Sequence, residues 1–480
     1  MSDVVIVGGG VGGLMAAIRL RCAGHEVTVL ERLPQFGGKL ATYSRDGYHF
    51  ELGPSLLTWP QVIDDVFRLA GTSLADEVQL VRLAQPFRYF WPGSGGTATF
   101  HDDAVATAQS LDGMSPGSGD EYLRFLRHSR KIWEVSERTF FLGPMTGPLS
   151  LLRRMNSPRD FVSIDARRTL WKASKKHFSD PRLRQWLGRY ATYSGSSPFE
   201  SPATLSCIPA LEADQGSWYV RGGLGALRNA MVAVAERSGV QLQSGVDVTG
   251  VVAKRGRVTG VRTANRGEIK ADIVVANVDA EHLYRDLLPH ARRLKKVRKA
   301  GRSTSGIVVL VGARGTTEGI AHHNVWFSKD YAHEFADVKS GLLPNEPTIY
   351  ACVSAVTDAT QAPANSENWF ILVNAPAGLA VKDGIGDRLL NELARRGPDL
   401  RGRAEFVETL SPKDFEMRYR SSGGAIYGTS SNGMRAAFRR PVNTGPVKGL
   451  YLVGGSSHPG GGLPMVTTSA RIVSELISTR

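Results

Sequence analysis

The first thirty residues alternate between apolar runs and a glycine-rich break. Residues 4–7 are four consecutive branched apolar side chains, residues 12–23 carry apolar positions at helical spacing, and residues 26–30 read Glu-Val-Thr-Val-Leu. A buried strand, a helix and a second strand in such close succession predict a β-α-β unit, in which the two strands lie side by side and parallel.

Further along, the pattern changes several times. Residues 76–101 predict short strands and turns, whereas 119–190 predict mainly helix, with the apolar side chains of 121–135 on one helical face. Gly143-Pro144 and Gly147-Pro148 interrupt these helices and predict a mobile neck. The remaining predicted elements are a helix at 224–237, strands at 240–243, 247–253, 257–263 and 271–277, strands at 303–313, 347–356 and 367–374, and a strand–loop–helix over the last fifty residues.

The break in the first unit is a G-x-G-x-x-G motif formed by Gly8, Gly10 and Gly13. The first glycine permits a tight turn, the second lets the backbone approach a pyrophosphate, and the third lets the helix lie close to the sheet. The amino terminus of the helix then offers N–H groups and a positive dipole end to phosphate. Glu31 ends the second strand and is placed to accept hydrogen bonds from a ribose diol. The motif in this context predicts a dinucleotide site.

Two further segments favour FAD over NAD. Gly37-Gly38, just after Glu31, lets more backbone pass the same cofactor and resembles the extension of glutathione-reductase-like FAD proteins. At the far end of the chain, residues 452–465 precede the last helix. In the fold that the chain resembles, this loop passes the flavin, and the amino terminus of the helix would stabilise negative charge on reduced flavin. No second G-x-G-x-x-G lies between a strand and a helix, so a separate NAD(P)H domain is not expected. The predicted residues for non-covalent FAD binding are Gly8, Gly10, Gly13, Glu31, Arg32, Gly37, Gly38, Lys39, Val248, Gly454, Gly455, Gly462, Pro464 and Met465.

Several longer stretches resemble the bacterial phytoene desaturase family of carotenoid enzymes, within the flavin amine oxidase superfamily. They include FELGPSLLTWP at 50–60, HHNVWFSKDY at 322–331 and LYLVGGSSHPGGGLPMVTTSA at 450–470. The stretches at 177–206 and 421–434 most resemble the hydroxycarotenoid 3,4-desaturases, also called methoxyneurosporene dehydrogenases. The resemblance runs nearly from end to end. It implies an FAD-dependent enzyme that introduces double bonds into an acyclic carotenoid by hydride transfer to flavin N5.

Such a desaturation also requires a proton acceptor, and the sequence offers two candidates. His458 lies in the predicted flavin-side loop and has a side chain that titrates near neutrality. Glu51 lies in the FELGP stretch. Each has an alternative reading, because His458 could shape its loop through backbone hydrogen bonds and Glu51 could anchor a loop. No metal site is predicted, because Cys22, Cys207 and Cys352 are scattered and form no Cys-x-x-Cys pair.

The charge of the chain is strongly positive, with a formal value of +14 at pH 7. Residues 121–190 hold 16 Lys and Arg against 6 Asp and Glu, and ARRLKKVRKAGR at 291–302 has seven basic residues and no acid. We expect this surface to lie on an anionic membrane, with Trp133 and residues 140–142 dipping into the interface. The alternative is a solvated basic surface. No motif that reads nucleic acid is present.

Together these observations predict an α/β protein with a glutathione-reductase-like Rossmann FAD-binding domain, a second mixed-sheet substrate domain and a helical, membrane-facing region. The FAD-binding domain is expected to be discontinuous, over 1–75, 215–290 and 430–480. The substrate domain would comprise 76–118 and 291–429, and the basic helical entry region 119–214. Strand residues begin at Val4 and leave no room for a signal peptide, and unpaired cysteines suit a reducing compartment. We therefore expect a cytoplasmic protein with peripheral membrane association.

Three other functions fit parts of this pattern. The protein could be an FAD-dependent oxidase of another polyene or secondary metabolite, or a redox-neutral carotene isomerase. In a different class, the GDP-dissociation-inhibitor proteins share the glycine turn but bind prenyl lipids without requiring flavin. For the enzyme, the expected partners are a hydrophobic polyene, an anionic membrane surface and oxygen or a quinone as electron acceptor, with no nucleic acid.

Overall fold

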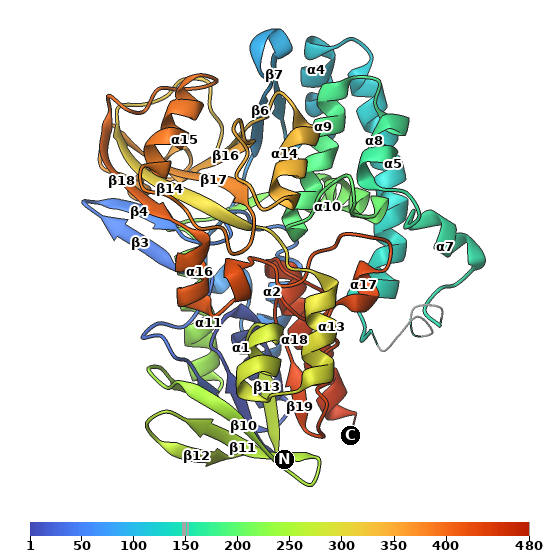
Figure 1. Cartoon of the computed structure of the whole chain (residues 1–480), viewed down its shortest axis with the longest axis vertical. Helices are drawn as coiled ribbons and strands as arrows, with labels where there is room; N and C mark the ends of the chain where they lie inside the picture. Colours follow the sequence, from blue (N-terminus) through green and yellow to red (C-terminus); the bar gives the residue numbers. More distant parts are fainter. Residues whose placement is uncertain (146–149, 151–152, 480) are drawn as a thin grey trace.

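The computed structural model describes residues 1–145, 150 and 153–479, so the Gly147-Pro148 part of the predicted neck lies outside the described residues. In the view of Figure 1, an α/β layer lies at the bottom, a seven-stranded sheet at the upper left and a group of helices at the upper right. The two ends of the chain both lie in the lower layer (Figure 1).

A five-stranded parallel sheet forms the centre of the lower layer. The predicted β-α-β unit is confirmed: β1 (Asp3–Val7) pairs with β2 (Glu26–Leu30), and α1 (Val11–Cys22) connects them. The chain later adds β9 (Gln241–Gln243) beside β2 and β13 (Ile273–Ala276) on the other side of β1, and β19 (Leu450–Leu452) completes the sheet. Segments from the start, middle and end of the chain therefore share one sheet.

Both faces of this sheet are covered, as parallel strands require. Four helices pack on one face: α1, α2 (Gln61–Leu69), α11 (Leu224–Arg237) and α18 (Leu463–Ser478). The other face packs against an antiparallel sheet and three short elements: β10 (Val248–Lys254), β11 (Arg257–Thr263), β12 (Gly267–Lys270), α12 (Ala280–His282), η5 (Leu283–Leu287) and α13 (Ala291–Ala300).

The upper sheet is mixed, as predicted. Its strand order is β18 (Ala404–Leu410), β14 (Ser305–Arg314), β17 (Ser366–Ala375), β16 (Ile349–Val353), β15 (His323–Trp326), β6 (Phe87–Phe90) and β7 (Thr97–Phe100). All neighbours are antiparallel except β15 and β6. One face packs on α15 (Ile385–Ala394) through Leu389, Leu390 and Leu393, and this leaves the opposite face for the functional site.

The remaining elements are smaller. They are the hairpin β3 (Thr42–Arg45) and β4 (Tyr48–Glu51), α3 (Leu74–Glu77), the pair β5 (Leu80–Arg82) and β8 (Trp218–Val220), α14 (Tyr331–Lys339), η6 (Ser354–Val356), η7 (Ala359–Gln361), α16 (Pro412–Tyr419), η8 (Ser422–Gly424), α17 (Ala436–Arg439) and η1 (Gly93–Gly95).

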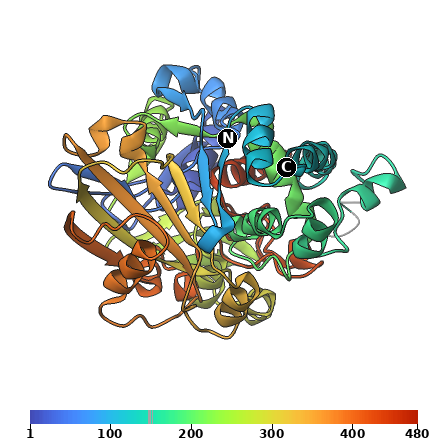
Figure 2. The ribbon, with the colours of Figure 1, turned by 90° about the horizontal axis from the view of Figure 1, so that it is seen from above.

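The stretch predicted to be mainly helical is helical, and it stands to one side of the upper sheet (Figure 2). The elements are α4 (Ala104–Met114), α5 (Ser118–Ser136), η2 (Glu137–Phe141), α7 (Pro158–Ser163), α8 (Leu170–His177), α9 (Pro181–Arg189), η3 (Tyr190–Ser194), η4 (Ala203–Ser206) and α10 (Cys207–Gln215). They share an aromatic core with β6 and β7 that includes Phe125, Phe178 and Trp186. In the described part of the chain, no helix has both the length and the apolar character needed to cross a bilayer.

The aromatic side chains expected to dip into a membrane also contact other aromatic rings of the protein. The ring of Trp133 packs edge-on against Trp59, at 5.0 Å between centroids, and stacks on Phe141. Phe140 packs edge-on against His458, at 4.8 Å. The rings of Trp133, Phe140 and Phe141 are thus partly buried against the carboxy-terminal loop and Trp59, and their insertion into a membrane stays a prediction.

Candidate functional site: a cavity between the glycine turn and the upper sheet

One continuous cavity of about 500 Å³ connects the two layers. At one end it is lined by the β1–α1 turn, residues 37–39 and segments between 453 and 466; we call this the glycine end. At the other end it is lined by side chains of β6, β14–β17, α14 and the end of α9; we call this the sheet end. Its volume falls in the usual range for a ligand site.

The glycine turn has the close packing that its motif predicts. Gly8 has a φ of +98°, and a Cβ there would lie 2.6 Å from the carbonyl oxygen of Asn277. A Cβ on Gly13 would lie 2.2 Å from the carbonyl oxygen of Gly8. Gly8 and Gly10 line the cavity, whereas Gly13 lies behind them and lets α1 approach β1. The Asn277 side chain, which the motif does not predict, donates a hydrogen bond to Gly8 at 3.0 Å.

The amino terminus of α1 is open toward the cavity. Its N-cap is Gly10, no side chain caps the helix, and no acidic residue lies in the first turn. The N–H groups of this turn are therefore available to an anion, and the helix dipole adds to their attraction. Together with the glycines that leave room for a backbone-hugging ligand, this end of the cavity fits the pyrophosphate of a dinucleotide.

Glu31 lies beside that turn and is 8% exposed. One carboxylate oxygen accepts a hydrogen bond from the N–H of Gly9 at 2.8 Å, and the other accepts one from Leu33 at 2.8 Å. Each oxygen retains a lone pair, so the carboxylate can still accept hydrogen bonds from ribose hydroxyls. Its position in the cavity wall agrees with the predicted role.

The segment after Glu31 also lines the cavity. A Cβ on Gly38 would lie 3.0 Å from the Cα of Gly10, so a larger residue would close the space above the turn. Lys39 is half-buried and donates a hydrogen bond from its ammonium group to the carbonyl of Ile426. Burial lowers the pKa of Lys39 to about 8, against a smaller opposing effect of Asp279. Arg32 lines the cavity and donates to the carbonyl of Arg418 at 2.6 Å.

The carboxy-terminal segment meets the glycine turn in space. A Cβ on Gly12 would lie 3.1 Å from the Cα of Gly454, and β19 lies two strands from β1 in the same sheet. Gly454, Gly455, Gly462 and Pro464 line the cavity, as does Val248 from β10, whereas Met465 does not. The amino terminus of α18, at Gly462, has no side-chain cap and no acid in its first turn.

Arg440 holds this segment in place, and it is not among the site residues predicted from the sequence. Its buried guanidinium donates to three backbone carbonyls, those of Tyr427, Thr429 and Gly455, at 2.7–3.1 Å. Burial lowers the pKa of Arg440 to about 10, so the side chain remains charged at pH 7. A lone arginine in a loop carries no motif, and only the folded chain brings the three carbonyls together.

Neither residue predicted as proton acceptor lines the cavity. His458 is 1% exposed, and its Nε2 is 3.0 Å from the carbonyl oxygen of Gly143, to which it donates. Burial lowers the pKa of His458 to about 4. Glu51 accepts a hydrogen bond from the N–H of Leu224 at the start of α11, and burial raises its pKa to about 7. These contacts favour the loop-anchoring alternatives, and a catalytic role for either residue stays a prediction.

The sheet end is walled mainly by apolar and aromatic side chains, including Phe87, Val308, Val325, Phe370 and Leu372. The Tyr350 hydroxyl, also in the wall, lies 2.5 Å from the Ser55 hydroxyl and 2.8 Å from Nδ1 of His323. Because strand side chains alternate between faces, only every second residue of each strand faces the cavity. The sequence pattern shows these strands but not which of their faces would be lined.

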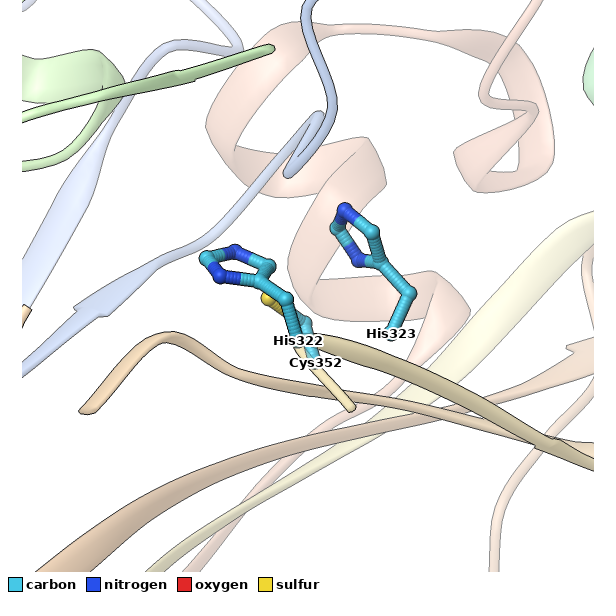
Figure 3. A group of neighbouring side chains, drawn as sticks. All are labelled: His322, His323 and Cys352. Atoms are coloured by element: carbon cyan, nitrogen blue, oxygen red, sulfur yellow. The ribbon is translucent and has the colours of Figure 1, made fainter. Parts of the chain in front are cut away.

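Behind Tyr350, the side chains of His322, His323 and Cys352 form a buried group (Figure 3). One ligand atom from each lies within 4.8 Å of the others, so the group could hold a metal ion. Nδ1 of His322 is 2.7 Å from the Thr357 hydroxyl, and both Nε2 atoms lack a hydrogen-bond partner among the described residues. Burial raises the pKa of the Cys352 thiol and lowers those of both imidazoles, so three neutral side chains are favoured in the absence of metal.

A Rossmann layer with an open glycine turn, joined to a mixed sheet through a cavity, is the arrangement expected of a flavin-dependent oxidoreductase. The chain belongs to the family described as "Flavin containing amine oxidoreductase", whose model matches residues 11–478. FAD is the cofactor of this family, and the glycine end of the cavity fits its dinucleotide part. The alternative of a flavin-free lipid-binding escort protein is thereby set aside.

Similar proteins cover nearly the whole chain. A 4,4'-diapolycopene oxygenase of Methylomonas sp is 34% identical over 99% of this chain and 97% of its own length. A 4,4'-diaponeurosporene oxygenase of Staphylococcus aureus is 33% identical over 99% of this chain and 98% of its own. Among solved structures, a cyclohexylamine oxidase from Brevibacterium oxydans has a TM-score of 0.63 at 13% identity, covering all of this chain and 99% of its own. This last likeness bears on the fold alone.

Proposed function

We propose that the protein is an FAD-dependent oxidoreductase that introduces double bonds into an acyclic carotenoid. The observation that carries this proposal is the continuous cavity, in which a dinucleotide-fitting end opens into a wall of apolar side chains from the upper sheet. The substrate class is supported by the two relatives above, both named for long acyclic polyenes.

In a desaturation, one carbon next to the polyene loses a hydride and its neighbour loses a proton, so one double bond forms and two electrons leave the substrate. Bound FAD would supply the hydride acceptor at N5, and oxygen or a quinone would take up the electrons afterwards. The protein's own share is to position the hydrocarbon and to exclude water. Val325, Phe370 and Leu372 are placed for both tasks.

A second candidate reaction is oxygenation of the end of the polyene, because both relatives are named oxygenases. The two reactions are distinguished by the product. Purified protein with FAD would be incubated with liposomes that contain an acyclic carotenoid, and the product analysed by mass and visible spectrum. Desaturation removes two hydrogen atoms and lengthens the conjugated system, whereas oxygenation adds oxygen. A carotenoid unchanged in mass would contradict both, and a changed spectrum at unchanged mass would point to isomerisation.

We also propose that the protein is cytoplasmic and takes its substrate from an anionic membrane surface. In support, Arg124, Arg127 and Lys131 are exposed on the outer side of α5, and Val162 on α7 is 77% exposed. Basic side chains beside an apolar one are suited to an anionic leaflet. Co-sedimentation with vesicles containing anionic lipid, lost with neutral lipid or high salt, is the expected result. Equal binding to neutral vesicles would contradict the proposal.

A further inference from the structure

The sheet end of the cavity contains a buried positive charge that a hydrocarbon substrate does not explain. Arg189, the last residue of α9, lines the cavity and is 6% exposed. Its guanidinium carbon lies 4.8 Å from the ring centre of Phe87, 5.1 Å from that of Tyr193 and 5.9 Å from that of Tyr350. An aromatic cage therefore fixes the direction of the guanidinium beside walls that are mainly apolar.

The hydrogen bonds of Arg189 are few for a buried guanidinium. Nη1 donates to the hydroxyls of Tyr89 and Tyr193, each at 3.1 Å. Among the described residues, no carboxylate lies within ion-pair distance of Arg189, and no protein acceptor contacts its Nε or Nη2. The nearest acidic influence is indirect, because Glu212 accepts the hydrogen bond of Tyr193 at 2.9 Å.

Two other arginines in the interior have more acceptors than Arg189. Arg440 has its three carbonyls, and Arg396 has Glu392 and two carbonyls. Glu334, the other charged side chain of the sheet end, accepts from the Ser328 hydroxyl and from both the N–H and the hydroxyl of Thr348. Because a guanidinium in an apolar environment is stabilised by acceptors, the remaining N–H groups of Arg189 are available to a partner that enters the cavity.

We propose that Arg189 binds an oxygen atom at the end of the carotenoid, a carbonyl, carboxylate or hydroxyl, and so selects polyenes with an oxygenated end. The proposal rests on the proposed function and deepens it by naming the substrate class. Rings of Phe87 and Tyr193 hold the guanidinium while the apolar wall takes the hydrocarbon. The same contact fixes how far the polyene enters the cavity.

The test compares two probes, an acyclic carotenoid hydrocarbon and the same carbon chain with a terminal aldehyde. Binding of each to the FAD-loaded protein is followed without oxygen through the absorption of the polyene. We expect the wild-type protein to bind the aldehyde about tenfold to a hundredfold more tightly, as for a hydrogen bond to a charged donor. Arg189→Met removes this preference and leaves hydrocarbon binding within about threefold.

The matched control is Arg184→Met on the same helix, outside the cavity wall, which keeps the preference. If Arg189→Met does not fold, Tyr193→Phe provides the second variant: it removes one acceptor but leaves the guanidinium, so the aldehyde preference persists. A purely structural Arg189 predicts instead equal affinity for both probes in the wild-type protein. If the wild-type protein binds both probes well and with equal affinity, only the role proposed for Arg189 is overturned. If it binds neither probe, the proposed function is overturned too.

Discussion

The two ends of the cavity are built in opposite ways. The glycine end is made of backbone: three closely packed glycines, an uncapped helix and a second glycine segment that touches the first. The sheet end is made of side chains that come from five strands and two helices far apart in the sequence. A cofactor common to a whole family can be held by backbone, whereas substrate choice depends on side chains that differ between members. Substitutions at the glycine end should therefore impair FAD binding, whereas substitutions at the sheet end should impair carotenoid turnover.

The largest effect is expected at the glycine end. In Gly13→Ala the new methyl group would lie 2.2 Å from the Gly8 carbonyl oxygen, so α1 has to move away from β1. We predict complete loss of bound FAD, measured as flavin absorbance per protein. Gly113→Ala is the control: it also lies in a helix, but nothing lies within 4 Å of its new methyl group. An FAD content equal to wild type in Gly13→Ala would contradict the close-packing account.

A substitution at the sheet end should leave the cofactor in place. Leu372→Trp fills the space in front of β17, so we predict normal FAD content with a fall in carotenoid turnover of about tenfold or more. Leu372→Ile, which conserves volume, serves as the control. If Leu372→Trp loses FAD as well, the two ends are not separable and the comparison above is wrong.

Between the two ends, Arg440 connects the carboxy-terminal loop to the rest of the site. Arg440→Met leaves three carbonyls without their charged donor, and we predict a loss of about 3 kcal/mol in the free energy of unfolding together with weaker FAD binding. Urea denaturation with and without FAD measures both. The exposed neighbour Arg439→Met should change neither. A shift in stability without any change in FAD affinity would separate the loop from the cofactor.

The smallest effect on turnover is expected at Glu51, which lies outside both ends. Its pKa of about 7 in the folded protein exceeds the ordinary 4.5. The protonated carboxyl therefore stabilises the fold below pH 4.5, and this contribution is lost as the pH rises through 7. Relative to Glu51→Gln, the free energy of unfolding of the wild-type protein should fall by about 1–3 kcal/mol as the pH rises from 4.5 to 7.

Turnover of Glu51→Gln separates anchoring from catalysis. If Glu51 only anchors its loop, the substitution should change turnover by less than about threefold. Loss of a proton acceptor would typically lower turnover by about a hundredfold or more. The same reasoning applies to His458→Gln, whose amide can still donate to Gly143. A hundredfold loss in either variant, at normal FAD content, would return that residue to the catalytic role first considered for it.

The difference between the ends also explains what the sequence could predict. Gly8, Gly10 and Glu31 are legible because a turn, a helix start and a strand end lie within thirty residues and impose fixed requirements on side-chain size and charge. The role of Arg189 could not be predicted from the sequence, because it depends on Phe87 and Tyr350, which lie on separate strands and reach Arg189 only in the folded chain. His458 and Glu51 were predicted from conspicuous sequence stretches, but neither side chain lines the cavity in the folded protein.

The same limit applies to the helical region over 119–214. Helical spacing correctly predicted the buried face of α5, including Phe125 and Leu126. It could not reveal that Trp133 packs against Trp59, because that contact joins segments more than seventy residues apart.

The central claim is that both ends of the chain hold a flavin whose ring faces the apolar sheet end. A crystal structure of the FAD-bound protein with an acyclic carotenoid tests it most directly. The account predicts the pyrophosphate at the amino terminus of α1, residues 453–464 against the flavin ring, and the polyene along Val325 and Leu372. A ring turned away from the sheet, or a polyene bound outside the cavity, would contradict it.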